Sequence, residues 1–187
     1  MHGLLCSFNS FTYLGSDYAL AYNLADAGYD VWLGNARGNK YSRRHVSLDP
    51  DNDSRKFFDF SYEEVGLYDL PAMIDFVLAK TKRDKLYYVG HAQGGTAFFV
   101  LNSLNTEYQS KFASAHLMAG NGYEKYFPNK IVKLLSTAID PIYSVALLID
   151  YVELKPSSKL TTILAETLVN STVPQELIGG GSVRQAA

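Results

Sequence analysis

The feature that most constrains this chain is a glycine-bounded turn that joins a predicted strand to a predicted helix. Residues 85–89 read Lys-Leu-Tyr-Tyr-Val, which is typical of a short buried strand, and residues 93–104 follow a helical pattern. Between the two lie Gly90, His91, Ala92, Gln93 and Gly94. Their spacing is that of a nucleophile elbow, in which flanking glycines prevent collisions across a strained central residue. The sequence therefore predicts an α/β fold that displays position 92 above a sheet.

The residue at the centre of this elbow is Ala92, and alanine has no oxygen with which to attack an ester. In a working elbow a serine oxygen is held there, beside backbone N–H groups that stabilise an oxyanion. Without that oxygen no acyl-enzyme can form. Removing such a serine alone lowers turnover by on the order of a millionfold. The sequence thus predicts an elbow without hydrolytic activity.

The remaining members of a catalytic triad are also not identified. In this fold the nucleophile is followed by an acid and then by a histidine. His116, the one histidine after the elbow, falls in the next predicted strand, which is too soon for the base. We interpret the other histidines as structural residues: His2, His45 and His91. Asp140 and Asp150 are interpreted as helix-associated residues, so no triad is assigned.

The pattern along the first 120 residues alternates between strands and helices, as in a parallel α/β sheet. Further strands are predicted at 29–33 and 113–119, and a long loop at 34–56. A helix over 17–27 is predicted to be capped by Ser16 and to stop at Gly28. A capping box at 61–64 opens another helix. Because Pro71 interrupts that helix, a second one is predicted, capped by Asp69 and ending near Lys80.

The alternation of strands and helices is not continued after Gly120, and residues 121–187 are interpreted as a helical insertion over the sheet. Asp140 is predicted to cap a helix that has Pro141 at its first position and continues to Val152. With about 13 residues, this helix is too short to span a membrane. The glycines at 179–181 are expected to mark the point where order fades.

Composition narrows the possible partners. The formal net charge of −2 gives no long-range field, so neither nucleic acid nor an anionic membrane surface is expected. No run of about 18 apolar residues exists that would form a transmembrane helix. No cofactor or metal site is predicted. Aromatic residues make up 13%, which fits either a tyrosine-rich core and surface or an aromatic-lined apolar site.

Signals of cellular location are weak. The chain opens with Met-His-Gly and no basic patch before an apolar run, so no secretory signal is recognised. Cys6 is the only cysteine, which leaves no internal disulfide, and it is expected to be a small buried side chain. Two glycosylation sequons, at Asn52 and Asn170, give weak support for a secretory origin.

Three segments in addition to the elbow resemble one family. Residues 1–7 (Met-His-Gly-Leu-Leu-Cys-Ser), 25–38 and 68–75 look like the corresponding segments of the acid lipases, the gastric and lysosomal lipase group with its insect relatives. The resemblance runs from residue 1 to about 117 and is looser over 121–187. It implies an α/β-hydrolase fold in which 1–120 is part of the core and 121–187 is part of a cap or lid.

The resemblance also implies roles for individual residues. Leu4 and Gln93 correspond to the residues whose backbone N–H groups form the oxyanion hole, and Ala92 occupies the serine position. The acid and the histidine of the family are expected beyond the end of this chain. The family has strands before its His-Gly-Leu segment that this chain lacks, which makes the chain look like a piece of a lipase.

Several functional hypotheses follow. The first is a catalytically silent lipase-family protein, related to secreted or lysosomal enzymes that hydrolyse neutral lipid esters. The second is a non-catalytic module that binds a fatty-acyl group or neutral lipid, with Leu4 and Gln93 intact. Two others are that Ala92 is a deliberate substitution in a working lipase, and that the chain does not fold stably.

Overall fold

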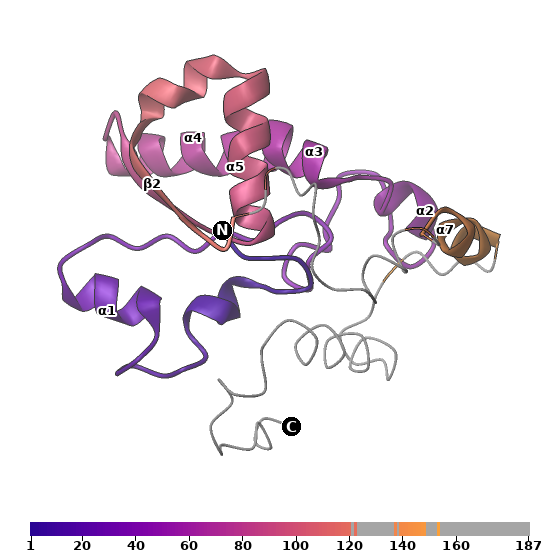
Figure 1. Cartoon of the computed structure of the whole chain (residues 1–187), viewed down its shortest axis with the longest axis horizontal. Coiled ribbons are helices and arrows are strands. Elements are labelled where there is room, and N and C mark those ends of the chain that lie inside the picture. Colours follow the sequence, from indigo (N-terminus) through magenta and orange to yellow (C-terminus); the bar gives the residue numbers. More distant parts are fainter. Residues whose placement is uncertain (121, 123–136, 138, 149–152, 154–187) are drawn as a thin grey trace. The chain divides into compact units, whose positions relative to one another are not determined.

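A pair of parallel strands forms the sheet of the described part of the chain (Figure 1). β1 (Leu86–His91) and β2 (Phe112–Met118) pair from Leu86 opposite Phe112 to His91 opposite Met118. The predicted strands at 85–89 and 113–119 are therefore confirmed, and so is their parallel pairing. β1 extends further than expected, because Gly90 and His91 still belong to it.

The computed structural model describes residues 1–120, 122, 137, 139–148 and 153. The chain divides into two compact units, Met1–Glu124 and Lys125–Ala187. In the second unit, α7 (Ile139–Leu148) already includes Asp140, so the prediction that Asp140 caps this helix from outside is wrong, and Pro141 lies inside the helix as predicted. That these units are a hydrolase core and a cap remains a prediction. Asp150, Asn170 and the glycines at 179–181 lie outside the described residues.

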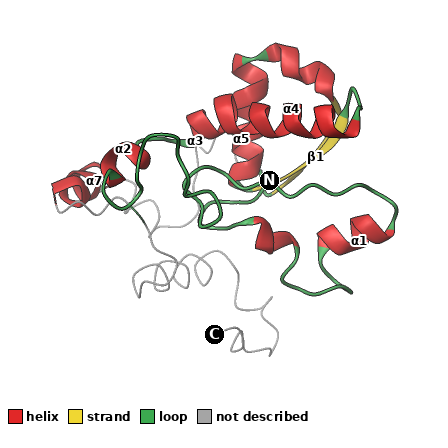
Figure 2. Cartoon of the chain, turned by 180° about the vertical axis from the view of Figure 1, so that it is seen from behind, coloured by secondary structure: helices red, strands yellow, loops and turns green. Residues whose placement is uncertain are grey.

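Helices cover one side of the strands. Both views of the chain place α4 (Leu70–Thr81) and α5 (Gln93–Leu104) on this side and α1 (Leu20–Asp26) on the other (Figures 1 and 2). The buried side chains between the strands, α4 and α5 include those of Ile74, Tyr88 and Leu101. Burying apolar side chains of this size stabilises a fold by about 1.5–3 kcal/mol each. This layer fixes the end of β1 from which the elbow projects.

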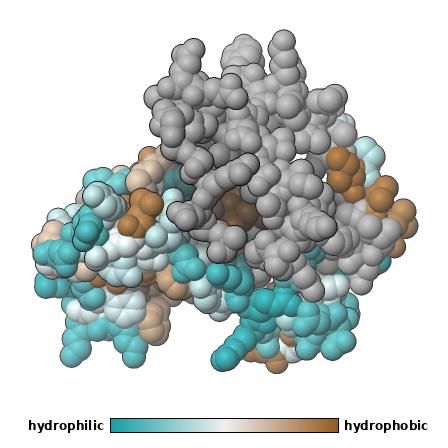
Figure 3. All heavy atoms as spheres, turned by 90° about the horizontal axis from the view of Figure 1, so that it is seen from below, coloured by the Kyte–Doolittle hydropathy of each residue, from teal (hydrophilic) through white to brown (hydrophobic). Residues whose placement is uncertain are grey.

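Aromatic rings contribute to this core and also reach the surface. The Tyr88 and Phe98 rings stack with centroids 5.3 Å apart, and the Phe98 and Phe112 rings pack edge to face with centroids 5.0 Å apart. Other apolar side chains lie in separate patches among hydrophilic ones on the face shown in Figure 3. The interpretation of the aromatic content as a tyrosine-rich core and surface agrees with this distribution.

One long helix replaces the two that were predicted around Pro71. The capping box is confirmed, because Ser61 Oγ accepts from Glu63 N and Glu64 Oε2 accepts from Ser61 N. α3 (Tyr62–Glu64) then continues through η2 (Val65–Asp69), a π-helical turn, into α4 without interruption. The wider π turn accommodates a proline, which has no N–H for the regular helical bond. Asp69 is helical (φ −70°, ψ −49°), so the prediction that it caps a helix is wrong.

The first helix begins later than predicted. α1 starts at Leu20 with Ala19 before it, and Ser16 does not cap it because its hydroxyl donates to Asp17 instead. The predicted stop is confirmed: α1 ends at Asp26, and Gly28 follows with a φ of 91°. A positive φ at this position ends a helix and suits glycine.

The strand predicted at 29–33 is not found. Tyr29 is 52% exposed and Trp32 45% exposed, and the segment belongs to neither described strand. The physical reason is that Met1 occupies the edge of β1 that is not paired with β2. Met1 N donates to Val89 O at 2.6 Å, and His91 N donates to Met1 O at 2.9 Å. With that edge taken, residues 29–33 have no described strand to pair with.

The remaining described elements are short. η1 (Phe8–Phe11) precedes α1, α2 (Ser54–Phe57) lies in the predicted loop at 34–56, and η3 (Thr106–Lys111) precedes β2. Cys6 is exposed, so its predicted burial is wrong, because it sits at the end of a surface turn. Within the described residues, no helix has both the length and the apolar character needed to cross a membrane.

Candidate functional site

The backbone at Ala92 has the strain expected of an elbow. β1 ends at His91 and α5 begins at Gln93, so Ala92 alone makes the turn, with φ 46° and ψ −111°. Non-glycine residues rarely adopt a positive φ, and such a conformation costs about 1–3 kcal/mol. Three backbone bonds hold it: Ala92 N donates to Met118 O, and Ala92 O accepts from Gly95 N at 2.8 Å and from Thr96 N at 3.3 Å. The local geometry is that of a sharp strand-to-helix turn.

The glycines beside Ala92 are required by space. A Cβ at Gly90 would lie 2.8 Å from Cε1 of Tyr88 and 2.9 Å from the carbonyl of Gly94. A Cβ at Gly94 would overlap the carbonyl oxygen of Met1. The buried Tyr88 hydroxyl donates to Gly94 O at 2.7 Å, and burial raises the pKa of Tyr88. The first turn of α5 is thus pressed against both β1 and Met1, which leaves no room for larger residues.

A second backbone segment lies against the elbow. A Cβ built on Gly3 would be 3.1 Å from Cβ of Ala92, so the Gly3 main chain is in contact with the elbow. Cys6 N donates to Gly3 O at 3.2 Å, which closes a turn over 3–6 in which Leu5 has a φ of 59°. Leu4 is 66% exposed. The structure therefore brings the segment containing Leu4 next to the segment containing Gln93, as an oxyanion hole requires.

His2 is buried behind this turn, and its partners fix its protonation. Nδ1 lies 2.8 Å from Gly3 O, which can only accept, so Nδ1 carries the proton. Nε2 accepts from Ala36 N at 3.2 Å and lies 3.3 Å from Nδ2 of Asn39. Burial is the main reason why the pKa of His2 is lowered, and the positive charge of the Met1 amino group lowers it further. The bond to Gly3 opposes this shift. His2 is held in the neutral form.

His91, inside the elbow, has a different environment. Its Nδ1 is buried and has no hydrogen-bond partner in the part of the chain that the structure describes. This atom would be 3.1 Å from a Cβ at Gly3, so it lies between the elbow and the 3–6 turn. A buried polar atom without a partner is uncommon in a folded protein. The atom is a buried hydrogen-bonding group next to the Gly3 main chain.

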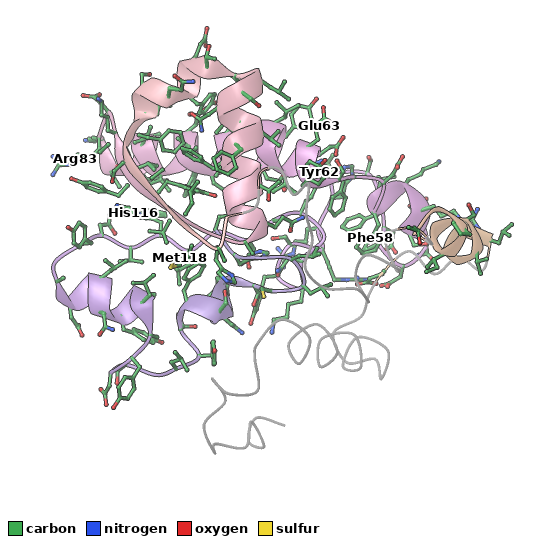
Figure 4. All side chains as sticks on the ribbon, in the orientation of Figure 1. Phe58, Tyr62, Glu63, Arg83, His116 and Met118 are labelled. Carbon is green, nitrogen blue, oxygen red and sulfur yellow. The ribbon has the colours of Figure 1, made fainter. Side chains whose placement is uncertain are left out.

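The other histidines have structural contacts, which agrees with their interpretation. His116 is exposed on β2, with Nε2 3.0 Å from Oγ of Ser114, and Figure 4 shows it on the strand that ends at Met118. Nδ1 of His45 accepts from Ser47 N and Leu48 N in a surface loop. Among the described residues no cluster of ligands suited to a metal ion is present.

The sequence reasoning missed the residues that support the 3–6 turn. Asn39 Nδ2 donates to Cys6 O at 2.7 Å as well as pointing at the His2 ring. Arg37 donates to Asp69 through its backbone N at 2.8 Å and its Nε at 2.7 Å. Both residues lie in the 25–38 segment or directly after it. Its resemblance to the acid lipases was the available signal, but the spacing alone did not reveal these contacts.

This fold and site define the class of the protein. A strained turn between a parallel strand and a helix, with a glycine-containing loop against it, is the arrangement of α/β-hydrolases. The family described as alpha/beta hydrolase fold matches residues 1–148. The chain belongs to the α/β-hydrolase fold family.

Within that family the chain is acid-lipase-like. Lipase 1 of Drosophila melanogaster is 54% identical over 124 residues, which are 66% of this chain and 28% of Lipase 1. Lipase 3 of the same species is 38% identical over 193 residues, covering 99% of this chain and 48% of Lipase 3. Human gastric triacylglycerol lipase is 44% identical over 133 residues, covering 71% of this chain and 33% of that lipase. The chain spans less than half the length of each of these relatives.

Proposed function

We propose that this chain is a lipase-family protein that does not hydrolyse esters, because its nucleophile position is Ala92. The observation that carries the proposal is the φ of 46° and ψ of −111° at Ala92, which puts a methyl group where an elbow needs a hydroxyl. The backbone N–H groups of Leu4 and Gln93 support the assignment of an oxyanion hole. Those groups can polarise a carbonyl, but no atom at position 92 can attack it.

The substrate class of the parent activity is a further part of the proposal. Two of the relatives are called lipases, and a third is called gastric triacylglycerol lipase. We infer that the ancestral reaction of this site was hydrolysis of neutral lipid esters. Loss of the serine would remove about a millionfold in turnover, and binding and oxyanion contacts would leave a residual effect near a thousandfold over water.

Ester turnover tests this proposal directly. The purified protein is incubated with p-nitrophenyl butyrate and, separately, with a fluorophosphonate that labels activated serines. We expect the ester to be hydrolysed no faster than in buffer alone, and we expect no fluorophosphonate adduct on the protein. The same assays are run on Ala92→Ser, which adds a hydroxyl at the centre of the elbow. Ala25→Ser adds a hydroxyl on the exposed face of α1 and is the matched control. A burst of p-nitrophenol or a fluorophosphonate adduct on the unmodified protein would show that the silent-enzyme proposal is wrong.

Binding of a fatty-acyl group is the second candidate function. Two exposed apolar side chains favour it, Leu4 at 66% and Leu5 at 48%, because they adjoin the oxyanion position. An apolar chain would contact these leucines, while the Leu4 and Gln93 N–H groups bind the carboxyl or carbonyl oxygen. Saturable displacement of a fluorescent fatty acid would support this function. A flat titration up to high micromolar ligand would exclude it.

A secretory origin is proposed from the sequon at Asn52. Asn52 is exposed in the loop before α2, with its N–H bonded to Asp49 at 2.9 Å, so its side chain is accessible for glycosylation. The protein made in its own cell type is treated with peptide N-glycosidase, with Asn52→Gln as the comparison. We expect a mass decrease that Asn52→Gln reduces. An unchanged mass in both proteins would remove the proposal of a secreted or lysosomal glycoprotein.

A further inference from the structure

The peptide that carries the Leu4 N–H is held from its opposite side. Gly3 C=O and Leu4 N–H belong to one trans peptide, so they point in opposite directions. Gly3 O accepts from His2 Nδ1 at 2.8 Å and from Cys6 N at 3.2 Å. Two donors from different residues thus fix the carbonyl, and the plane of the peptide bond transmits that direction to the N–H.

We propose that His2 is the positioning residue of the oxyanion hole, and that only its neutral form with the proton on Nδ1 aims the Leu4 N–H at position 92. The inference rests on the proposed function, since it concerns the same site. Gly3 lies against the Ala92 methyl, so the next N–H along the chain is beside the elbow. His2 itself faces away from position 92, toward Ala36 and Asn39, and acts only through the Gly3 peptide.

The other side of the His2 ring is fixed by the loop that contains Ala36 and Asn39, and this loop is in turn held by further contacts. Ala36 N donates to Nε2, and Asn39 Nδ2 is within 3.3 Å of it while also bonding Cys6 O. The same amide group therefore contacts both the ring and the far end of the 3–6 turn. The loop thus reaches the Gly3 carbonyl through the His2 ring.

The series of contacts that holds the His2 ring extends to the π turn. Asp69, at the end of η2, accepts from the backbone N and Nε of Arg37 at 2.8 and 2.7 Å. The Arg37 guanidinium also lies 5.9 Å from the Phe60 ring and 5.7 Å from the Tyr68 ring. Asp69 thus holds the residue next to Ala36. The contacts run without a gap from the helix to the Leu4 peptide.

Protonation of His2 would break this arrangement. A proton on Nε2 would face the Ala36 N–H and the Asn39 amide, both of which are donors. Of the titratable groups, the Met1 amino group acts on His2, and Arg37, the residue after Ala36, is paired to Asp69. The Met1 charge opposes protonation of His2. Because the pKa of His2 is lowered, the Leu4 peptide should turn at a pH below the usual pKa of a histidine.

Nuclear magnetic resonance on the purified, ligand-free protein tests this inference. The one-bond N–H residual dipolar coupling of Leu4 reports the orientation of that bond, and the coupling of Gln93, on α5, is the internal reference. Long-range proton–nitrogen correlations of the His2 ring should show the Nδ1–H form. As the pH falls, the Leu4 coupling should change with the same midpoint as the His2 ring, whereas the Gln93 coupling stays constant.

Two variants separate positioning from mere packing. His2→Phe keeps a buried ring but removes both hydrogen bonds, so the Leu4 coupling should fall toward the averaged value of a mobile peptide. His2→Asn retains an N–H donor near Nδ1 and should keep most of the coupling but lose its pH dependence. His116→Asn, at an exposed histidine on β2, is the matched control and should change neither.

The outcomes are decisive in each case. An Nε2–H ring in the unmodified protein, or a Leu4 coupling that ignores the titration of His2, would overturn the inference. So would an unchanged Leu4 coupling in folded His2→Phe. If His2→Phe does not fold, the pH titration of the unmodified protein still decides. Because no ligand or ester is used, failure of the silent-lipase proposal would leave these results intact, and the reverse also holds.

Discussion

At position 92 the surrounding structure, rather than the residue, sets the backbone. Alanine has no preference for φ 46° and ψ −111°, yet bonds to Met118 and from Gly95 hold it there. The turn therefore has elbow geometry with an alanine at its centre. This explains how an elbow can be recognised from its glycines although its central residue carries no chemistry.

Replacement of Ala92 by glycine tests that strain. We expect Ala92→Gly to raise the free energy of unfolding by about 1 kcal/mol, because glycine adopts a positive φ without steric cost. Ala25→Gly in α1 should lower it by about 1 kcal/mol, since glycine disfavours helix. Urea denaturation measures both. A decrease of similar size in the two variants would contradict strain at the elbow.

At the scale of elements, the π turn links packing to the site. η2 brings Gly66 against α5, where a Cβ would lie 2.7 Å from Cβ of Val100 and 3.0 Å from Ala97 O. The same turn ends at Asp69, which holds Arg37. Pro71, which the sequence predicts to separate two helices, thus lies in one continuous helix. The π turn before it makes two contacts, one with α5 through Gly66 and one with Arg37 through Asp69.

Substitution of Gly66 tests this close approach. Gly66→Ala should lower the free energy of unfolding by about 2 kcal/mol through overpacking against α5. Val100→Ala removes Cγ1, one of the two Val100 atoms that would lie 2.7 Å from the new Cβ, so the double variant should lose less than the sum of the two single losses. Thermal melts of all three variants give the coupling. Strictly additive losses would mean that the two side chains do not collide.

The segment at 29–33 gives another test at this scale. Trp32 is the only tryptophan in the chain and is 45% exposed, and its ring packs edge to face with that of Phe76, with centroids 5.8 Å apart. We expect a red-shifted emission spectrum and efficient quenching by acrylamide. A blue-shifted, poorly quenched indole would instead indicate the buried strand that the apolar pattern predicts. N-acetyltryptophanamide serves as the exposed standard.

Local patterns predicted the elements well where the deciding contacts are local. α5 begins and ends at the predicted residues, and the capping box at Ser61 is present. Residues 29–33 were predicted incorrectly because strand formation depends on a partner, and Met1 fills the edge of β1. The His2 contacts to Ala36 and Asn39 span more than 30 residues, so no spacing rule could reveal them.

For the whole molecule, buried groups that resist protonation link stability to pH. In a chain with a free Met1 amino group, burial lowers its pKa to about 5, and burial also lowers the pKa of His2 below its usual value of about 6.5. In the unfolded chain both groups bind protons at higher pH. As the pH falls, the unfolded state therefore binds protons that the folded state does not bind, and the free energy of unfolding decreases.

Melting at several pH values checks this linkage. We expect the melting temperature to decline from pH 8 toward pH 5, with the part due to His2 confined to pH values below about 6.5. His2→Asn should remove that lower part, whereas His116→Asn should leave the whole profile unchanged. A melting temperature that is constant or rises on acidification would contradict the sign derived from the two buried groups.

The persistence of the elbow at Ala92 has a consequence for the history of the chain. Every alanine codon differs from a serine codon at its first base alone, so one transversion separates the two residues at this site. Because neighbouring bonds already impose the turn, a hydroxyl introduced by that mutation would arrive in its working orientation without any rearrangement of the backbone. The alanine and serine forms of this position are thus genetically close, and populations can be compared at this codon.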